Sequence, residues 1–139
     1  VGPHPMNQAT LRFAGYAGLF DRADAARDTI RHGAFRRSLA RTDRALPLLW
    51  QHRPDQPIGA VESASEDARG LRVVGRLDAA ASYPARALAR GELSGLSFGY
   101  RVRHCRYHDH GRELLDIDLV EISLVTHPLQ HSARIHLVV

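Results

Sequence analysis

The sequence predicts a mainly β fold with inserted helices (α+β), in which an antiparallel sheet or barrel carries one or two helices. Most of the chain alternates apolar and polar residues with the period of a strand. Turn sequences such as EDARG (66–70) and DHGR (109–112) separate the alternating stretches. Only residues 82–93 combine helix-forming residues with helix start and stop signals.

The chain length suits one domain with one core, since 139 residues contain 44% hydrophobic residues. We expect residues 1–10 to form an N-terminal tail and residues 11–139 to form the single domain. Met6 is a candidate natural start, in which case residues 1–5 are an added remnant.

The first elements are a strand and a short helical segment. LRFAGYAGLF (11–20) alternates with small residues and predicts a strand. DTIRHGAFRRSL (28–39) places apolar residues near helical spacing but contains Gly33. This pattern predicts a short helix or two turns.

A buried strand and a hairpin follow. ALPLLWQH (45–52) is an apolar run that stops at His52, and RPDQP (53–57) after it is expected to be a turn. Residues 58–65 and 71–77 are expected to form the arms of a hairpin.

The second half predicts a helix and a long hairpin. Residues 82–93 have Pro84 near the first turn and Gly91 near the end, as helices do. Residues 96–108 and 113–125 alternate as strands on either side of the DHGR turn.

The charge distribution argues against a nucleic-acid or membrane partner. All 19 basic residues are Arg, and they are dispersed among 15 acids for a formal net charge of +4. A nucleic-acid-binding protein usually gathers its basic residues on one face. No stretch approaches the roughly 18 apolar residues of a membrane helix. Cys105 is the only cysteine, which excludes an internal disulfide and fits a cytoplasmic compartment.

Ser97 is a candidate nucleophile, because GELSGLSFGY (91–100) contains the pattern G-x-S-x-G. In α/β-hydrolases this pattern places the serine on a sharp turn from a strand into a helix. Here the sequence after Ser97 continues as a strand, and the predicted helix precedes it. Asp118 and His127 follow in the required order, yet the parallel βαβ units of that fold are missing. An esterase-type hydrolase is therefore the least favoured alternative.

His52 is the candidate base for Ser97, because a serine nucleophile needs a neighbouring group to take its proton. It ends the apolar run LPLLW and precedes a stretch with two prolines. A histidine held at the end of a buried strand can reach solvent and titrate near neutral pH. A surface histidine without function is the alternative interpretation.

A metal site and a cofactor site are not expected. RHCRYHDH (103–110) contains histidines and Cys105, which zinc favours. On a strand, however, the histidines at 104, 108 and 110 share one face and the cysteine points to the other. No second pair of ligands with zinc spacing is present, and no glycine-rich phosphate loop is found.

The sequence resembles the prohead (procapsid maturation) serine proteases of HK97-type tailed phages over residues 11–135. Each similar block is weak alone, but four in order are specific. The blocks are FAGYAGLFDRADAARDTIRHGAFRRSL (13–39), WQHRPDQPIGAV (50–61), GELSGLSFGYRV (91–102) and LVEISLVTHPLQHSARI (119–135).

This resemblance implies an antiparallel β-barrel flanked by helices, related in fold to the herpesvirus assembly proteases. It implies a serine endopeptidase with Ser97 as nucleophile and His52 as base. The expected substrates are the major capsid protein precursor, the scaffold and the protease itself. Cleavage is expected inside the procapsid, in the cytoplasm of the host bacterium.

The resemblance also implies a homo-oligomer, with a dimer as one form, because the herpesvirus relatives gain activity on dimerising. The Arg- and Ala-rich composition would further suit a gene-transfer agent, a domesticated phage particle. An inactive structural assembly module of the same fold is the main alternative function.

Glu121 is the predicted third catalytic residue. Period two places it on a largely apolar face of 113–125 with Ile117 and Leu119, where an unpaired carboxylate is costly. Pairing with the His52 imidazolium would remove that cost, although a buried Arg could serve as the partner instead. His127, which would mimic the second histidine of the herpesvirus proteases, and Asp118 remain alternatives.

Overall fold

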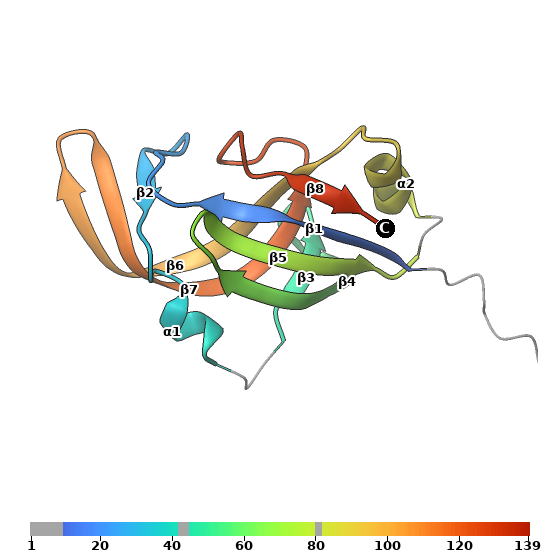
Figure 1. Cartoon of the computed structure of the whole chain (residues 1–139), viewed down its shortest axis with the longest axis horizontal. Helices are drawn as coiled ribbons and strands as arrows, with labels where there is room; N and C mark the ends of the chain where they lie inside the picture. Colours follow the sequence, from blue (N-terminus) through green and yellow to red (C-terminus); the bar gives the residue numbers. More distant parts are fainter. Residues whose placement is uncertain (1–9, 42–44, 80–81) are drawn as a thin grey trace, which may run out of the picture.

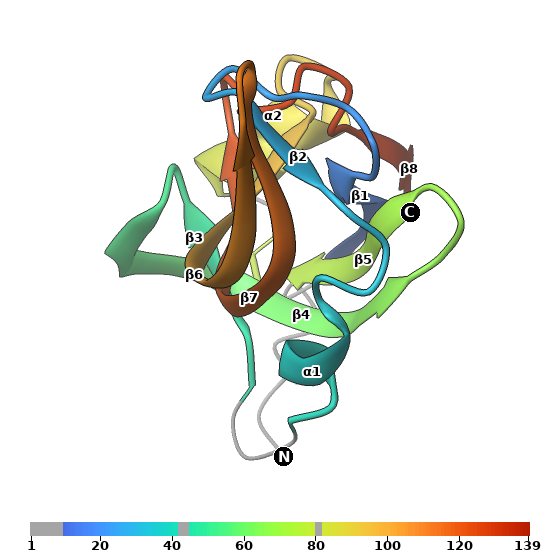
Figure 2. The same ribbon diagram turned by 90° about the vertical axis from the view of Figure 1, so that its left-hand side faces the viewer.

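Eight strands form one curled, mixed sheet in the computed structural model, which describes residues 10–41, 45–79 and 82–139 (Figures 1 and 2). The order across the sheet is β2-β7-β3-β4-β5-β1-β8, and β6 also pairs with β7. The two helices of the described residues are short. The elements are β1 (Leu11–Leu19), β2 (Asp28–Ile30), α1 (Arg36–Leu39), β3 (Pro47–Trp50), β4 (Arg53–Glu66), β5 (Gly70–Leu77), α2 (Tyr83–Ala89), β6 (Gly95–His108), β7 (Gly111–Val125) and β8 (Ile135–Val138).

The predicted antiparallel barrel is only partly correct. The long hairpin β6–β7 and the strands β4, β5, β1 and β8 pair antiparallel, but β2 and β3 run parallel to β7. The named strands also leave the sheet open, and an isolated bridge between Gly95 and Arg134 joins its two sides. Alternating hydrophobicity indicates which face of a strand is buried, not the direction of its neighbour, so the pattern did not reveal the parallel pairs.

The core fills the inside of the curl. Figure 2 shows β1 and β5 on one side of the curl and β6 and β7 on the other. Their inward side chains, with Phe35 from the segment before α1, form one apolar cluster. Fully buried members include Phe13, Leu71, Leu96, Ile117, Ile122 and Leu124.

The predicted helical segment 28–39 is wrong over its first part. Residues 28–30 form β2, and only 36–39 are helical. Gly33 adopts φ +91°, a left-handed conformation that interrupts a helix. The backbone N–H groups of Gly33 and Phe35 instead donate to the carboxylate of Glu66, both at 2.8 Å.

The predicted helix at 82–93 is confirmed as α2. Ser82 precedes it, and its hydroxyl accepts a hydrogen bond from the Ala85 N–H at 3.4 Å. Pro84 lies in the first turn, where its missing N–H costs nothing. Gly91 follows the helix with φ +72°. The strands predicted at 11–20, 58–65, 71–77, 96–108 and 113–125 are also present, with slightly different ends.

The turn predicted at 53–57 is instead formed by residues 51 and 52. Trp50 pairs with Arg53, so Gln51 and His52 form a two-residue turn between β3 and β4. Residues 53–57 already belong to β4 and are exposed. Their two prolines suggested a turn, but an exposed strand tolerates proline where no ladder N–H is required.

A buried ionic cluster joins β2, β6 and β7. Asp28 is 2% exposed and accepts two hydrogen bonds from Arg112, each 2.8 Å long. The Tyr100 hydroxyl donates to the same carboxylate at 3.0 Å. The Arg112 hydrogen bonds are the largest cause that lowers the pKa of Asp28, and burial is the largest cause that raises the pKa of Tyr100, to about 12.

Asp28→Asn should therefore destabilise the protein at neutral pH by about 2 kcal/mol, because it leaves Arg112 without its charged acceptor. The folded-state pKa of Asp28 lies below its ordinary value of 3.8. The wild-type advantage should thus be present above pH 3.8 and disappear as the pH falls below it. Urea unfolding at several pH values measures this difference. The exposed Asp55→Asn serves as the control, and an equal loss in both variants would contradict the assignment.

Candidate active site

His52 is held in the turn between β3 and β4 in an unusual backbone conformation. Gln51 and His52 have φ values of +52° and +61°, a region that residues with side chains rarely occupy. Such turns match the twist of a β-hairpin and usually contain Asn or Gly. The surrounding hydrogen bonds must therefore stabilise this turn.

Those hydrogen bonds connect the turn to the end of β7. The backbone N–H of Gln51 donates to the Leu124 carbonyl at 3.0 Å. The Gln51 side-chain amide donates to the Thr126 hydroxyl at 2.6 Å and accepts from the Thr126 N–H at 3.1 Å. The backbone N–H of His52 donates to Ser123 Oγ at 3.1 Å. The position of the imidazole is thus fixed relative to β7.

The His52 ring contacts the buried carboxylate of Glu121. Nδ1 of His52 lies 2.7 Å from Oε1 of Glu121, and the Ser123 hydroxyl donates to Oε2 at 2.6 Å. The histidine side chain is 46% exposed, whereas that of Glu121 is 8% exposed. The hydrogen bond to Glu121 raises the pKa of His52 above its ordinary value of 6.5, against the opposing effect of burial.

Ser97 lies beside this network on β6. It is directly opposite Ser123 in the antiparallel β6–β7 ladder, and Gly99 is opposite Glu121. Opposed residues project from the same face of a sheet, with Cβ atoms about 5 Å apart. Ser97 and Glu121 therefore share one face. Ser97 is 5% exposed, and among the described residues no hydrogen bond joins it to His52.

A β-bulge at Val120 determines which face carries Glu121. Tyr100 pairs with Leu119 and Gly99 with Glu121, so Val120 is an additional residue on β7. Before the bulge Leu119 belongs to the core, and after it Ile122 does. The prediction that Glu121 shares the face of Ile117 and Leu119 is therefore wrong, because the bulge reverses the alternation. Glu121 is buried on the face opposite the core.

Gly99 provides the space for the Glu121 carboxylate. A Cβ atom at Gly99 would lie 2.8 Å from Oε1 and 3.0 Å from Cγ of Glu121. This approach is shorter than a van der Waals contact, so a side chain here would displace the carboxylate from His52. The second glycine of the G-x-S-x-G pattern thus has a structural role at this site.

This arrangement contains the elements of serine hydrolase chemistry. A carboxylate that accepts from Nδ1–H fixes the tautomer and leaves Nε2 as the basic nitrogen. A serine on the same face can supply the nucleophile. Hydrogen bonds between nucleophile and base are often long before substrate binds, so their absence here is compatible with this chemistry.

Among the described residues, neither of the other candidates for the third position forms a hydrogen bond or ion pair with His52. Asp118 pairs with Arg37 and Arg103. His127 is exposed beyond the end of β7. Glu121 does not pair with a buried Arg within the described residues; its carboxylate contacts His52 and Ser123.

The structure confirms that Ser97 does not lie on a strand-to-helix elbow. It is the third residue of β6, which continues as a strand to His108. The helix α2 precedes it, as the sequence pattern indicated.

In residues 10–41, 45–79 and 82–139, no group of three or more His, Cys, Asp or Glu side chains is arranged to hold a metal ion. Cys105 is a free, half-buried thiol. None of the helices described is long and apolar enough to cross a membrane.

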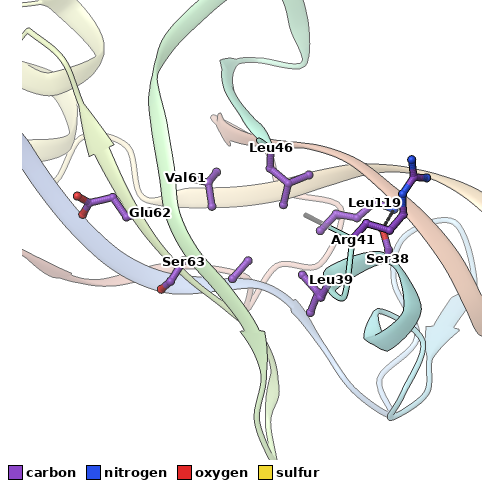
Figure 3. A pocket seen from close by; sticks show the side chains of 9 residues that line it. Ser38, Leu39, Arg41, Leu46, Val61, Glu62, Ser63 and Leu119 are labelled. Carbon is purple, nitrogen blue, oxygen red and sulfur yellow. Dashed lines mark hydrogen bonds between the residues drawn. The ribbon is translucent and has the colours of Figure 1, made fainter. Parts of the chain in front are cut away.

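One surface pocket lies apart from the candidate catalytic residues, and another borders them. Figure 3 shows the side chains that line one groove, and none of Ser97, His52 and Glu121 is among them. Its volume is about 250 Å³. A second pocket, of about 420 Å³, is bordered by His52 and Glu121 themselves. We call it the proline pocket, because Pro47, Pro54 and Pro57 contribute to its wall. The groove in Figure 3 is lined by Ser38, Leu39, Arg41, Leu46, Val61, Glu62, Ser63, Ala64 and Leu119.

Sequence reasoning missed three residues that support the site. Ser123 lies two residues from Glu121, a spacing that indicates a shared face, but no role at the site was predicted for it. Gly99 was considered only as part of the G-x-S-x-G pattern. Gln51 gave no signal, because its role depends on a turn that was placed after His52.

Comparison with known proteins identifies the family. Residues 3–139 match the family described as "Caudovirus prohead serine protease". The chain belongs to this family. It is 35% identical over 130 residues to the prohead protease of Enterobacteria phage HK97, an alignment that covers 88% of this chain and 58% of that protein. The chain therefore spans well under two thirds of this relative. The family predicted from the four sequence blocks is confirmed.

Solved structures confirm the related fold. The varicella-zoster virus protease superposes with a TM-score of 0.60 at 18% identity, covering 92% of this chain and 64% of that one. The KSHV protease in complex with a hexapeptide phosphonate inhibitor gives a TM-score of 0.53 at 15% identity, covering 84% and 60%. The predicted likeness to herpesvirus proteases is thus correct at the level of fold.

The His52–Glu121 contact predicts a specific change in titration. In the wild type, the pKa of His52 measured by NMR should exceed 6.5. Glu121→Gln should lower this pKa, because the carboxylate hydrogen bond that raises it is lost while the desolvation remains. Asp118→Asn, which removes a carboxylate from the same strand, is the matched control and should leave it unchanged. The reverse pattern would exclude Glu121 as the partner of His52.

Proposed function

We propose that this protein is a serine endopeptidase of procapsid maturation, with Ser97, His52 and Glu121 as its catalytic residues. The observation that carries the proposal is the 2.7 Å contact between His52 and a buried carboxylate on the sheet face that also carries Ser97. Family membership supports the same reaction class. No cofactor is required for it.

The reaction follows from the roles that these groups can take. His52 Nε2 accepts the proton of Ser97 Oγ as the oxygen attacks a peptide carbonyl. The resulting imidazolium is stabilised by Glu121 and gives its proton to the leaving amine. Water, deprotonated by the same imidazole, then hydrolyses the acyl-enzyme and regenerates Ser97.

The electrostatic environment of His52 suits this function. A general base works best when its pKa is near the operating pH. Glu121 raises the pKa of His52 above 6.5, and partial exposure lets the ring exchange protons with solvent. Ser123 acts as a positioning residue, since it binds both the Glu121 carboxylate and the His52 backbone.

The natural substrates are proposed from the relatives. The HK97 relative is named a prohead protease, and a herpesvirus protease of similar fold was solved with a hexapeptide phosphonate inhibitor. We infer that this chain cleaves the major capsid protein precursor or its scaffold, and itself, inside the procapsid. A homo-oligomer stays a prediction, favoured by the high local concentration of an assembling particle.

Labelling with a fluorophosphonate probe should test the catalytic residues directly. The wild type should be labelled and Ser97→Ala should not. His52→Ala should be labelled more slowly by a factor of at least about a thousand. Glu121→Gln should slow labelling by about 10²–10⁴. Intact mass and the labelled peptide measure the extent and the site.

Two controls accompany this experiment. His127→Ala should retain wild-type labelling, and Ser123→Ala should be labelled more slowly but still at Ser97. Labelling that survives His52→Ala would place the base elsewhere and favour an esterase-type site. A folded wild type that is never labelled, alone or in assembled particles, would favour the inactive structural module.

Production together with a capsid protein precursor should test the substrate. The precursor of the same particle, produced with the wild type, should be shortened by one defined cut, and Ser97→Ala should leave it intact. Mass spectrometry of assembled particles locates the new terminus. Equal processing with Ser97→Ala would show that another protease makes the cut.

A further inference from the structure

The proline pocket shares one sheet face with Ser97. Across the strands, Ser97 on β6 pairs with Ser123 on β7, which pairs with Leu49 on β3, which pairs with Pro57 on β4. Residues paired in this way project from the same face. Leu49 and Pro57 both line the pocket. The nucleophile and the pocket thus belong to one continuous surface, opposite the core.

The pocket also lies close to Ser97 along β6. Gly99 lines it and is two residues from Ser97, which corresponds to about 7 Å along a strand. An extended peptide advances about 3.3 Å per residue. A substrate whose carbonyl carbon is at Ser97 Oγ would therefore place one of its nearest two or three side chains at this pocket.

The lining of the pocket is apolar. Leu49, Val120 and three prolines form its walls, and proline contributes no backbone N–H that a polar side chain could use. The two titratable groups at its border, His52 and Glu121, already bind each other. The volume of about 420 Å³ lies in the lower part of the range of ligand pockets, enough for one large apolar side chain.

The bulge at Val120 contributes directly to this wall. The additional residue in β7 places Val120 next to Glu121 at the pocket, instead of leaving a regular strand there. Bulges often redirect side chains beside active sites. The same irregularity that presents Glu121 to His52 thus adds an apolar group to the pocket.

We propose that the proline pocket is a specificity subsite, which binds an apolar side chain of the polypeptide substrate within three residues of the cleaved bond. The inference rests on the proposed function, since it assigns the substrate preference of that same site. Burial of an apolar side chain beside His52 would hold the scissile carbonyl at Ser97.

Cleavage of a peptide library in which every residue type occurs at every position tests this subsite. Mass spectrometry identifies the cuts. At one position within three residues of the bond, the wild type should favour large apolar residues over charged ones by about tenfold or more. Val120→Thr, which replaces a methyl group by a hydroxyl at similar size, should weaken that preference.

A charge at the rim should change the preference in a defined direction. Pro54→Glu adds a carboxylate at an exposed lining residue and should increase cleavage of peptides with Lys or Arg at the same position by about tenfold. Gln56→Glu adds the same charge on the same strand at a residue that does not line the pocket. This control should retain the wild-type profile.

Fluorophosphonate labelling of the same samples separates the two proposals. A wild type that is labelled and cleaves peptides without any apolar preference near the bond would overturn the subsite alone. Identical profiles for Pro54→Glu and Gln56→Glu would do the same. A wild type that neither labels nor cleaves would contradict the proposed function, and the subsite with it.

Discussion

The pairing of β7 on both of its edges is the constraint on which the structure depends. One edge pairs with β6 along nearly its whole length, and the other pairs with β2 near its start and with β3 near its end. Each of these neighbouring strands places a residue of the candidate site or of the ionic cluster close to β7. Ser97 lies on β6, His52 in the turn after β3, and Asp28, the ionic partner of Arg112, on β2. Backbone pairing with β7 therefore brings these residues near one another, and side-chain hydrogen bonds then hold the His52 turn in place.

The local elements could largely be predicted from the sequence, because short-range patterns determine them. Alternation at 96–108 and 113–125 and the turn between them specified the long hairpin. The proline and glycine around 82–93 specified α2. The first part of segment 28–39 was misassigned because Ile30 is buried by its pairing with β7, whereas only Phe35 and Leu39 have the four-residue spacing of a helix.

Two features of the site depend on long-range contacts and had no reliable signal in the sequence. The turn at Gln51 and His52 lacks the usual Asn or Gly, and hydrogen bonds that its residues donate to Ser123, Leu124 and Thr126 stabilise it. The choice of Glu121 as partner of His52 agrees with the observed contact, but the argument for it assumed an uninterrupted strand. The bulge in the pairing of β6 with β7 places Glu121 on the face opposite the core.

At the bulge at Val120, the alternation of core-facing and outward-facing side chains along β7 reverses. Just ahead of it, Ile117 and Leu119 face the core; beyond it, Ile122 and Leu124 do. A single additional residue thus shifts by one position which side chains of the strand face the core. Loss of one residue there would exchange the buried apolar side chains for those that contact His52. A chain that kept every polar residue of the site but lacked this additional residue would place those beyond the bulge on the core face of the sheet.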